Sequence, residues 1–318
     1  MSQKSSKKLS GQTIALTGGT GFLGNHLLNS LLNAGHTVQA LTRSEQTDRD
    51  GVTWVNGSLS DAESLNALCK GADTLIHAAG LVKALTRDDF FDANVAGSKL
   101  VLTAAAKQKV SHVLHISSLA AREPRLSHYG ASKAAGELLL TARKWPFNWT
   151  VIRPPAIYGP GDMEILKLLK ATRFGLLPAP GNVNNRSSWI HVEDLAEAIT
   201  QLCDGSHSKA IVEIDDTKAG GYRAKDIAKA LSSTEQKPPK VFSIPFWVLG
   251  TIGAINGMVA SALNRPTMLT LSTARYLCHP DWTVREPRRP KLPNWSPQYN
   301  LKAGLRNTVD WYKKNGLL

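Results

Sequence analysis

The sequence predicts an α/β fold built on a doubly wound parallel sheet. Strand-like apolar segments alternate with helical segments along the first half of the 318-residue chain, as in parallel sheets that helices cover on both faces. The first strand, 13–16, leads into glycines spaced G-x-x-G-x-x-G, at Gly18, Gly21 and Gly24, and an apolar helical segment follows over 25–32. A strand, a glycine turn and a helix in this order indicate a Rossmann-type site for a dinucleotide.

The glycine turn suits a pyrophosphate for two physical reasons. Glycine allows the chain to bend where a Cβ would clash, and it lets main-chain N–H groups approach the ligand closely. The helix that follows points its free N–H groups and the positive end of its dipole at the same anion. We therefore expect the cofactor against Gly18, Thr20, Gly21, Phe22, Leu23 and Gly24. A tight turn without a ligand is the alternative.

Composition bounds the class of protein. The chain is 42% hydrophobic and 20% charged, which is ordinary for a globular protein. Its three cysteines lie far apart without the spacing of a metal site, so we expect no metal and a reduced, cytoplasmic setting. The net charge of +13 comes without a nucleic-acid-binding motif, which favours anionic cofactors, substrates or membrane surfaces over nucleic acid. Residues 1–10 are basic and polar, and we expect a disordered tail.

The second strand, 37–43, predicts which nicotinamide cofactor binds. An acidic residue at this strand end would bind the ribose 2′-OH of NAD, whereas an arginine accommodates the 2′-phosphate of NADP. Here Thr42-Arg43-Ser44 replaces the acid. Arg43 therefore favours NADP over NAD, unless its side chain simply faces solvent.

Further strands are expected at 52–55, 74–77 and 112–116, with helices from Ser60 or Asp61 to Leu68 and over about 88–107. The fourth strand ends at Ala78-Ala79-Gly80, where small residues leave room for the cofactor. His77 is interpreted as a buried residue at the end of that strand. The fifth strand delivers Ser117 and Ser118 at its carboxyl end, the edge at which open α/β sheets bind ligands.

A tyrosine and a lysine four residues apart, Tyr129 and Lys133, open the next helix. This separation places both side chains on one helical face. A nearby ammonium favours phenolate and lowers the pKa of the tyrosine, which suits proton transfer to a substrate oxygen. A solvent-exposed pair is the alternative, but the preceding strand–helix alternation and serine pair favour a functional site.

With these segments together, the chain resembles an extended short-chain dehydrogenase/reductase of the epimerase/dehydratase superfamily. The motifs that carry the resemblance follow the family's order: TGGTGFLG (17–24), HAAG (77–80), NVAGS (94–98), ISS (116–118), YGASK (129–133), RPPAIYGPGD (153–162) and WIHVEDLA (189–196).

The resemblance implies a role for each matching residue. Tyr129 would be the general acid/base, Lys133 would lower its pKa and hold the nicotinamide ribose, and Ser118 would bind the reacting oxygen, with Ser117 as the fallback. Asn94 would lie near the nicotinamide, together with Pro155 to Ile157. The remaining cofactor contacts would come from Arg43, Ser58, Leu59, Ala78, Ala79 and Gly80.

Two departures from the family pattern bear on cofactor and substrate. Gly57-Ser58-Leu59 replaces the Gly-Asp-Leu whose acid contacts adenine in many members, and Ala156 stands where nucleotide-sugar enzymes carry an asparagine. The sequence is therefore more similar to the 3β-hydroxysteroid dehydrogenase and dihydroflavonol reductase branches. A nucleotide-sugar epimerase or dehydratase with retained cofactor stays an alternative, as does a non-catalytic redox sensor or assembly factor.

The second half is expected to form a smaller, mostly helical substrate domain. The resemblance implies a cofactor domain of residues 11–156 plus about 190–214 and a substrate domain of 157–189 plus about 215–318. Arg186 would contact an anionic substrate or solvent, Asp194 would favour a helix start, and Asn300 would cap a final amphipathic helix from 301 to 312. A homodimer through helices 94–108 and 129–143 would follow the family's habit.

Residues 241–263 contain no charged side chain, and the segment is long enough to span a bilayer. Ser243, Pro245, Asn256 and three glycines lower its hydrophobicity. We prefer a helix that lines an apolar pocket or touches a membrane surface to collect a lipid-like substrate. The sequence thus predicts an NADP-dependent oxidoreductase that interconverts a hydroxyl and a carbonyl on an apolar small molecule.

Overall fold

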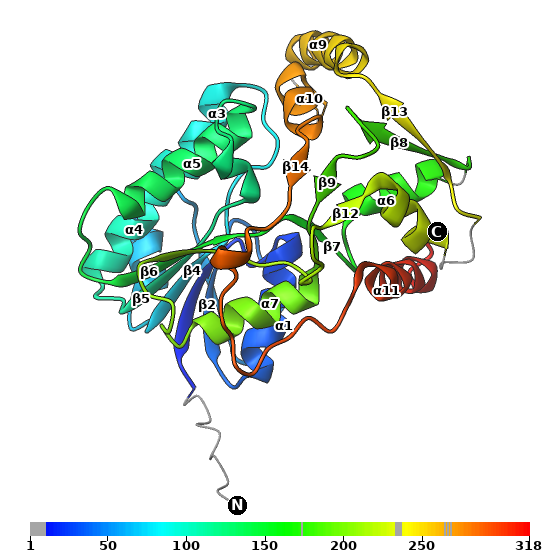
Figure 1. Ribbon diagram of the computed structural model, residues 1–318. Helices are drawn as coiled ribbons and strands as arrows, with labels where there is room; N and C mark the ends of the chain where they lie inside the picture. The colour runs from blue at the N-terminus through cyan, green and yellow to red at the C-terminus, as the bar shows by residue number, and fades with distance from the viewer. Residues whose placement is uncertain (1–10, 173, 233–236, 264, 266, 268) are drawn as a thin grey trace, which may run out of the picture.

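Seven parallel strands form the central sheet of the computed structural model, in the order β11-β6-β5-β4-β1-β2-β3 (Figure 1). The structure describes residues 11–172, 174–232, 237–263, 265, 267 and 269–318, so the expected tail at 1–10 lies outside it. The strands are β1 (Thr13–Thr17), β2 (Thr37–Thr42), β3 (Val52–Asn56), β4 (Thr74–His77), β5 (His112–Ile116), β6 (Asn148–Arg153) and β11 (Ala210–Glu213). The chain reverses its direction across the sheet between β1 and β4, and ligands bind outside the carboxyl ends of the strands at such a point.

Helices cover both faces of the sheet, as the alternating sequence predicts. Successive residues of β1 point to opposite faces: Ile14 and Leu16 pack with α1 (Phe22–Asn33) and α7 (Val192–Leu202), and Ala15 lies in the other core. That second core contains residues of α2 (Ala62–Cys69), α4 (Ser98–Lys107) and α5 (His128–Thr141). The doubly wound α/β prediction is confirmed.

Two helix predictions in this half need correction. Helix α1 begins at Phe22, three residues before the expected start, because Gly21 is already its N-cap. The helix expected over 88–107 is broken: α3 (Arg87–Phe91) passes into a π-helical turn, η1 (Asp92–Gly97), before α4 begins. Such wide turns are frequent at functional sites. As expected, Asp61 caps α2 by accepting a hydrogen bond from the Glu63 amide at 3.0 Å.

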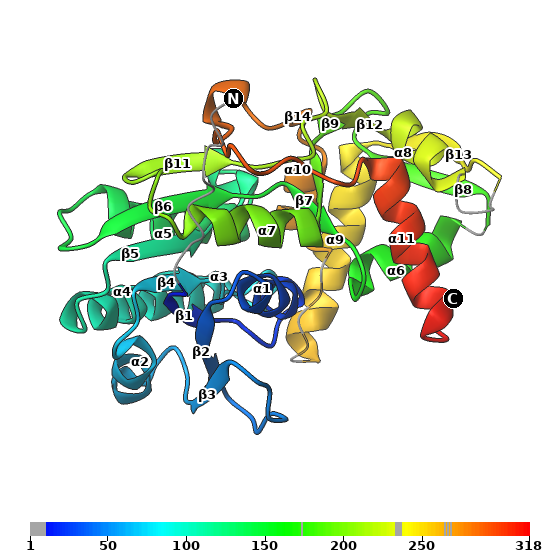
Figure 2. The ribbon, with the colours of Figure 1, turned by 90° about the horizontal axis from the view of Figure 1, so that it is seen from below.

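The C-terminal region is largely helical and has a core of its own, beside the sheet (Figure 2). Its helices are α6 (Met163–Thr172), α8 (Ala224–Leu231), α9 (Phe246–Ala262), α10 (Leu271–Leu277) and α11 (Leu301–Lys314). Small sheets join them: β7 (Ala156–Tyr158) with β10 (Trp189–His191), β8 (Leu176–Pro180) with β13 (Lys240–Ile244), and β9 (Arg186–Ser187) with β12 (Tyr222–Arg223) and β14 (Asp281–Trp282). Two 3-10 turns, η2 (Leu119–Arg122) and η4 (Glu286–Arg288), complete the elements of the described residues.

Two residues that the sequence places at helix starts, Asp194 and Asn300, lie there and accept hydrogen bonds from backbone amides. Asn300 caps α11, since its Oδ1 accepts a hydrogen bond from the Ala303 amide at 3.0 Å. Asp194 lies in the first turn of α7, and its carboxylate also accepts the backbone amides of Gln298 and Tyr299 at 2.9 and 3.0 Å. It thereby fastens the segment before α11 to α7.

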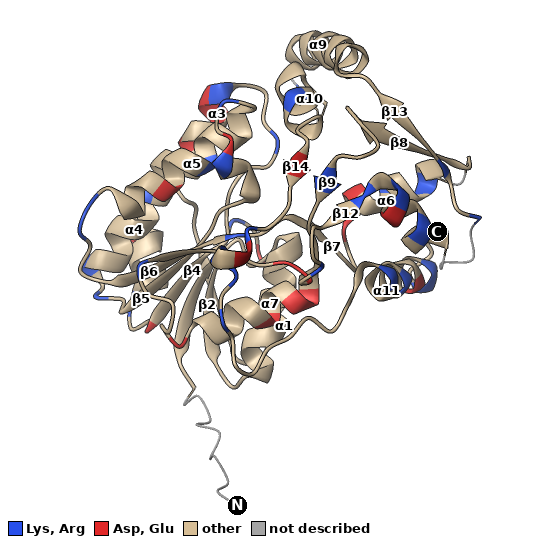
Figure 3. Ribbon diagram, in the orientation of Figure 1, with Lys and Arg blue, Asp and Glu red and all other residues tan. Residues whose placement is uncertain are grey.

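The apolar segment 241–263 is not one continuous helix. Residues 240–244 form strand β13, Pro245 ends that strand, and α9 follows over 17 residues. Among the helices that the structure describes, none is long and apolar enough to cross a membrane. Helix α9 lies at the edge of the molecule beside α10 and carries no charged residue (Figure 3).

Candidate active site

The glycine turn after β1 has the geometry of a phosphate cradle. Gly18 has φ of +77°, and a Cβ there would lie 2.8 Å from the Ala79 nitrogen. A Cβ on Gly24 would overlap the Gly18 carbonyl oxygen. No side chain caps the start of α1, and its first turn holds no acidic residue. The N–H groups of that turn are thus available for an anion.

The segment after β4 lies directly against this turn. The Thr17 hydroxyl accepts the Ala79 amide at 3.2 Å and is hydrogen-bonded to His77 Nδ1 at 2.7 Å. His77 is fully buried, its Nε2 contacts the Ser98 hydroxyl at 2.8 Å, and burial lowers its pKa to about 3. It is a neutral structural residue, as the sequence indicated, with two partners that sequence reasoning missed.

The residues expected at the adenosine end follow β2 and β3. Arg43 comes directly after β2 and has an exposed side chain. Ser58 and Leu59 follow β3, with the Ser58 hydroxyl bonded to that of Ser60 at 2.9 Å and Leu59 packed on the core. The carboxyl ends of β2 and β3 therefore bring together the residues predicted for the 2′-phosphate and the adenine.

Ser118 and Tyr129 meet at the carboxyl end of β5. Ser127 caps α5 through the Gly130 amide at 2.9 Å, which fixes the first turn that carries Tyr129. Burial raises the pKa of the Tyr129 phenol, and its hydrogen bond with Ser118 acts in the opposite direction. Ser117, the fallback, points elsewhere: it is buried and donates to Glu137 at 2.5 Å. The geometry favours Ser118 as the partner of the tyrosine.

Lys133 lies one turn after Tyr129 in the interior. Its Nζ donates to the Ile116 carbonyl at 2.9 Å, and burial lowers its pKa to about 8. Burial is the largest influence on the Tyr129 phenol, and the expected lowering of its pKa by this lysine stays a prediction. A Cβ on Gly80 would lie 3.2 Å from Nζ, so the absence of a side chain there keeps the approach to Lys133 open.

Asn94 lies in the π-helical turn η1 and is 3% exposed. Its side-chain amide accepts the Leu81 amide at 2.8 Å and donates to the Leu81 carbonyl at 3.0 Å and to Ser132 Oγ at 2.9 Å. Asn94 therefore ties the loop after β4 to the helix that carries Tyr129 and Lys133.

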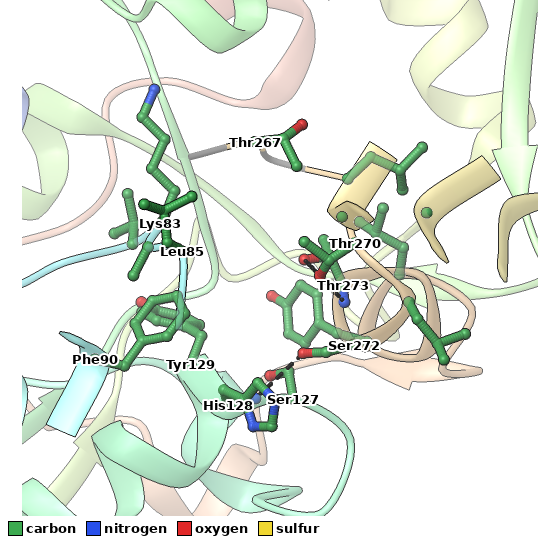
Figure 4. Close-up of a pocket in the computed structure, with 18 of the residues that line it drawn as sticks. Lys83, Leu85, Phe90, Ser127, His128, Tyr129, Thr267, Thr270, Ser272 and Thr273 are labelled. Atoms are coloured by element: carbon green, nitrogen blue, oxygen red, sulfur yellow. Dashed lines mark hydrogen bonds between the residues drawn. The ribbon is translucent and has the colours of Figure 1, made fainter. Parts of the chain in front are cut away.

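A cavity of about 830 Å³ opens beside this group (Figure 4). Ser118, Tyr129 and Pro155 to Ile157 lie on one wall, and the Phe90 ring is 6.2 Å from that of Tyr129. The opposite wall comes from α9 and α10 and is largely apolar, with Gly253, Ala254, Gly257, Met258, Leu271, Tyr276 and Leu277 among its residues. The preferred interpretation of 241–263 as a pocket-lining helix is confirmed for α9.

Comparison with known proteins agrees with this geometry. The profile of the NAD dependent epimerase/dehydratase family matches residues 14–214. The chain belongs to this family. It is 37% identical over 310 residues, 96% of each chain, to a "Ceramide reductase" of Caulobacter vibrioides. It is 30% identical to a "4-hydroxy-2-methyl-3-oxo-4-farnesyl-3,4-dihydroquinoline-1-oxide ketoreductase" of Stigmatella aurantiaca, covering 73% of this chain and 75% of the relative.

Solved structures show the same fold. The Bordetella bronchiseptica enzyme WbmG in complex with NAD superimposes with a TM-score of 0.72 at 18% identity, covering 98% of this chain and 97% of WbmG. Together with the family match, the reductase relatives show that this member of the epimerase/dehydratase family is an NAD(P)-dependent oxidoreductase of the extended short-chain type that acts on a small molecule.

In this family member a buried ionic network supports the site, and sequence reasoning missed it. Arg153 donates to both oxygens of Glu137, from Nε at 2.8 Å and from Nη2 at 2.6 Å. Arg153 Nη1 is 3.7 Å from Glu213, which lies 3.6 Å from Arg122. The network joins α5, β6 and β11. The sequence did contain a sign of this network, because Glu137 is four residues beyond Lys133 and lies on the same helical face.

The pocket also contains side chains for which the sequence carried no signal. Tyr276 and Ser272 come from α10 and line the cavity with Tyr129. Ser272 Oγ accepts the His128 amide at 3.3 Å, which joins α10 to the start of α5. Arg186, for which contact with an anionic substrate or with solvent was expected, lies in the small strand β9 and is not among the residues that line the cavity.

Proposed function

We propose that the protein interconverts a secondary alcohol and a ketone, or reduces an aldehyde, on an apolar substrate, with NADP as the cofactor. The observation that carries this proposal is the shared cavity: the hydroxyl-bearing residues Ser118 and Tyr129 form one wall of a largely apolar space of about 830 Å³. A carbonyl placed between the two hydroxyls would have its apolar chain against α9 and α10.

The residues of the cradle fit a dinucleotide. Gly18, Gly21 and Gly24 leave the start of α1 open to a pyrophosphate, and Gly80 leaves space in front of Lys133. Lys133 would bind the nicotinamide ribose, with Pro155 and Ile157 beside the ring. When bound, the nicotinamide supplies or accepts the hydride.

The chain's own residues handle the proton and the developing charge. In the direction of reduction Tyr129 donates its phenolic proton to the substrate oxygen, while Ser118 holds that oxygen by a hydrogen bond. The Lys133 ammonium stabilises the resulting phenolate, and its pKa of about 8 keeps it mostly charged near neutral pH. Asn94 positions Ser132 and the Leu81 loop around this group.

NADP is favoured by the chemistry at the end of β2. The exposed guanidinium of Arg43 is available to a 2′-phosphate, and no acidic residue occupies 42–44 to accept a ribose 2′-OH. Measuring the Kd of NADPH and NADH by fluorescence titration tests this choice. Tighter binding of NADH would contradict it.

An apolar, lipid-like substrate is favoured by the pocket wall and by the names of the two relatives, which act on ceramide and on a farnesyl-bearing quinoline ketone. A nucleotide-sugar substrate is less suited, because Ala156 lines the cavity where an amide side chain would be needed.

One experiment tests the function directly. The purified protein is analysed by mass spectrometry for retained nicotinamide and small molecules, then assayed with NADPH and long-chain ketones. We expect NADPH oxidation that depends on an apolar ketone. Conversion of a UDP-sugar without net NADPH consumption would favour an epimerase, and the absence of any turnover would favour a cofactor-binding sensor or assembly factor.

A further inference from the structure

Helix α9 exposes an apolar face that the proposed chemistry does not use. Trp247 is 71% exposed, and Ile255 and Val259 are each 51% exposed. They are spaced by eight and four residues, so they fall within an arc of about 120° on the helix surface. These three residues, here called the outer face of α9, do not line the cavity. The helix carries no charge over its 17 residues.

The adjoining side of the same helix is part of the pocket. Gly253, Ala254 and Gly257 line the cavity. A single helix thus separates the cavity that holds Tyr129 from the surrounding medium. Whatever contacts the outer face of α9 therefore lies within one helix diameter, about 10 Å, of the substrate space.

The mouth of the cavity is also apolar on both sides. Met258 and Leu277 line the cavity and are 66% and 39% exposed. Across the mouth, Val82 and Leu85 of the loop after β4 line it and are 61% and 37% exposed. In Figure 4 the Lys83 side chain extends away from Tyr129. The outer face of α9 and the mouth therefore form one apolar surface around the opening.

Charge on the α9 side of this surface has one sign. Residues 241–280 contain Arg265 and Arg275 and no aspartate or glutamate. On the other rim Lys83 is exposed, and the exposed acids Asp88 and Asp89 adjoin Arg87, which is 3.7 Å from Asp88. An apolar helix flanked by cations matches an anionic bilayer surface, in which apolar side chains enter the interface and lysine or arginine remains at the headgroups.

We infer that α9 and the cavity mouth dock in the plane of an anionic membrane, so that the pocket opens toward the bilayer. Trp247 suits this position, because tryptophan partitions to the membrane–water interface. The inference of membrane docking uses only the apolar and charged residues of this surface. The further step, in which a lipid-like substrate enters the pocket from the bilayer, rests on the proposed function.

The test is flotation of the 318-residue chain with vesicles of phosphatidylcholine alone or of equal parts phosphatidylcholine and phosphatidylglycerol. The triple variant Trp247→Gln, Ile255→Gln, Val259→Gln removes the outer face of α9 and leaves the pocket lining unchanged. Leu138→Gln on α5, where the leucine is 60% exposed, is the matched control. Thermal unfolding followed by circular dichroism verifies that each variant is folded.

We expect the wild type and the control to float with the anionic vesicles and to bind neutral vesicles more weakly. The triple variant should bind at least about tenfold less, because its contact with the interface is apolar. No flotation of the wild type, or equal flotation of the triple variant, would overturn the inference. A wild-type dimer lost in the variant without vesicle binding would assign the face to a second copy, and would also overturn it.

Turnover of a short-chain ketone dissolved in water separates the two proposals. If the wild type floats but reduces no ketone, the proposed function fails and docking stands. If the wild type and the triple variant reduce the dissolved ketone equally and neither floats, docking fails and the proposed function stands.

Discussion

The buried pair between Glu137 and Arg153 gives the sharpest stability prediction. The Glu137 side chain is 6% exposed and accepts three hydrogen bonds: two from Arg153, at 2.8 and 2.6 Å, and one from Ser117 at 2.5 Å. Glu137→Gln keeps the shape of the side chain and removes its charge. One oxygen is replaced by an NH₂ group that has to face a guanidinium or a hydroxyl.

The expected loss of folding stability depends on the charges that remain near Arg153. Removing one partner of a buried ion pair costs about 3–5 kcal/mol, because the other charge is left uncompensated. Glu213 is 3.7 Å from Arg153 Nη1 and still compensates part of that charge. We therefore expect a loss near the lower limit, about 3 kcal/mol, out of a typical total of about 5–15 kcal/mol.

Urea unfolding followed by circular dichroism measures this loss. Glu164→Gln is the matched control, because Glu164 pairs with Lys167 at a similar 2.8 Å but both side chains are about half exposed. Exposed pairs contribute about 0–1 kcal/mol. A loss below about 1 kcal/mol for Glu137→Gln, or equal losses for the two variants, would refute the reasoning.

Three further predictions concern the cofactor site. Gly24→Ala should abolish binding of NADPH, measured by fluorescence titration, because the new Cβ would overlap the Gly18 carbonyl oxygen. The control is Gly35→Ala, where φ is +85° but the space is free, and it should cost only about 1 kcal/mol of stability. Arg43→Ser should weaken NADPH about tenfold or more and leave NADH unchanged, because only NADP carries the 2′-phosphate. The Lys133 pKa is about 8 in the folded protein, below the 10.5 of an unperturbed lysine, so the unfolded chain binds more protons between these values and stability should rise with pH there. Lys133→Met should lack that rise of about 3 kcal/mol, measured by urea unfolding at both limits.

The sequence predicted the parts of the fold that local patterns determine. The glycine turn, the first five strands of the sheet and the helix with Tyr129 and Lys133 follow from residue types and spacing within short windows. The caps at Asp61 and Asn300 were predictable for the same reason, because a capping side chain acts on amides two or three residues away.

The features that were missed depend on contacts between distant segments. The π-helical turn at Asp92–Gly97 coincides with the Asn94 side chain bonded to Leu81, thirteen residues earlier. Strand β13 depends on pairing with β8, more than sixty residues before it. Neither contact leaves a periodic pattern, so 88–107 and 241–263 both resembled continuous helices. The wall of the cavity formed by α10 was unpredictable for the same reason.

Replacement of Tyr129 tests the central claim most directly. Tyr129→Phe removes only the phenolic oxygen and keeps the ring that packs 6.2 Å from Phe90. We expect kcat for reduction of an apolar ketone to fall by about 10²–10⁴-fold, the contribution of a positioned general acid, while the Kd of NADPH stays within about threefold. Unchanged turnover in this variant would contradict the assignment of Tyr129 as the proton donor.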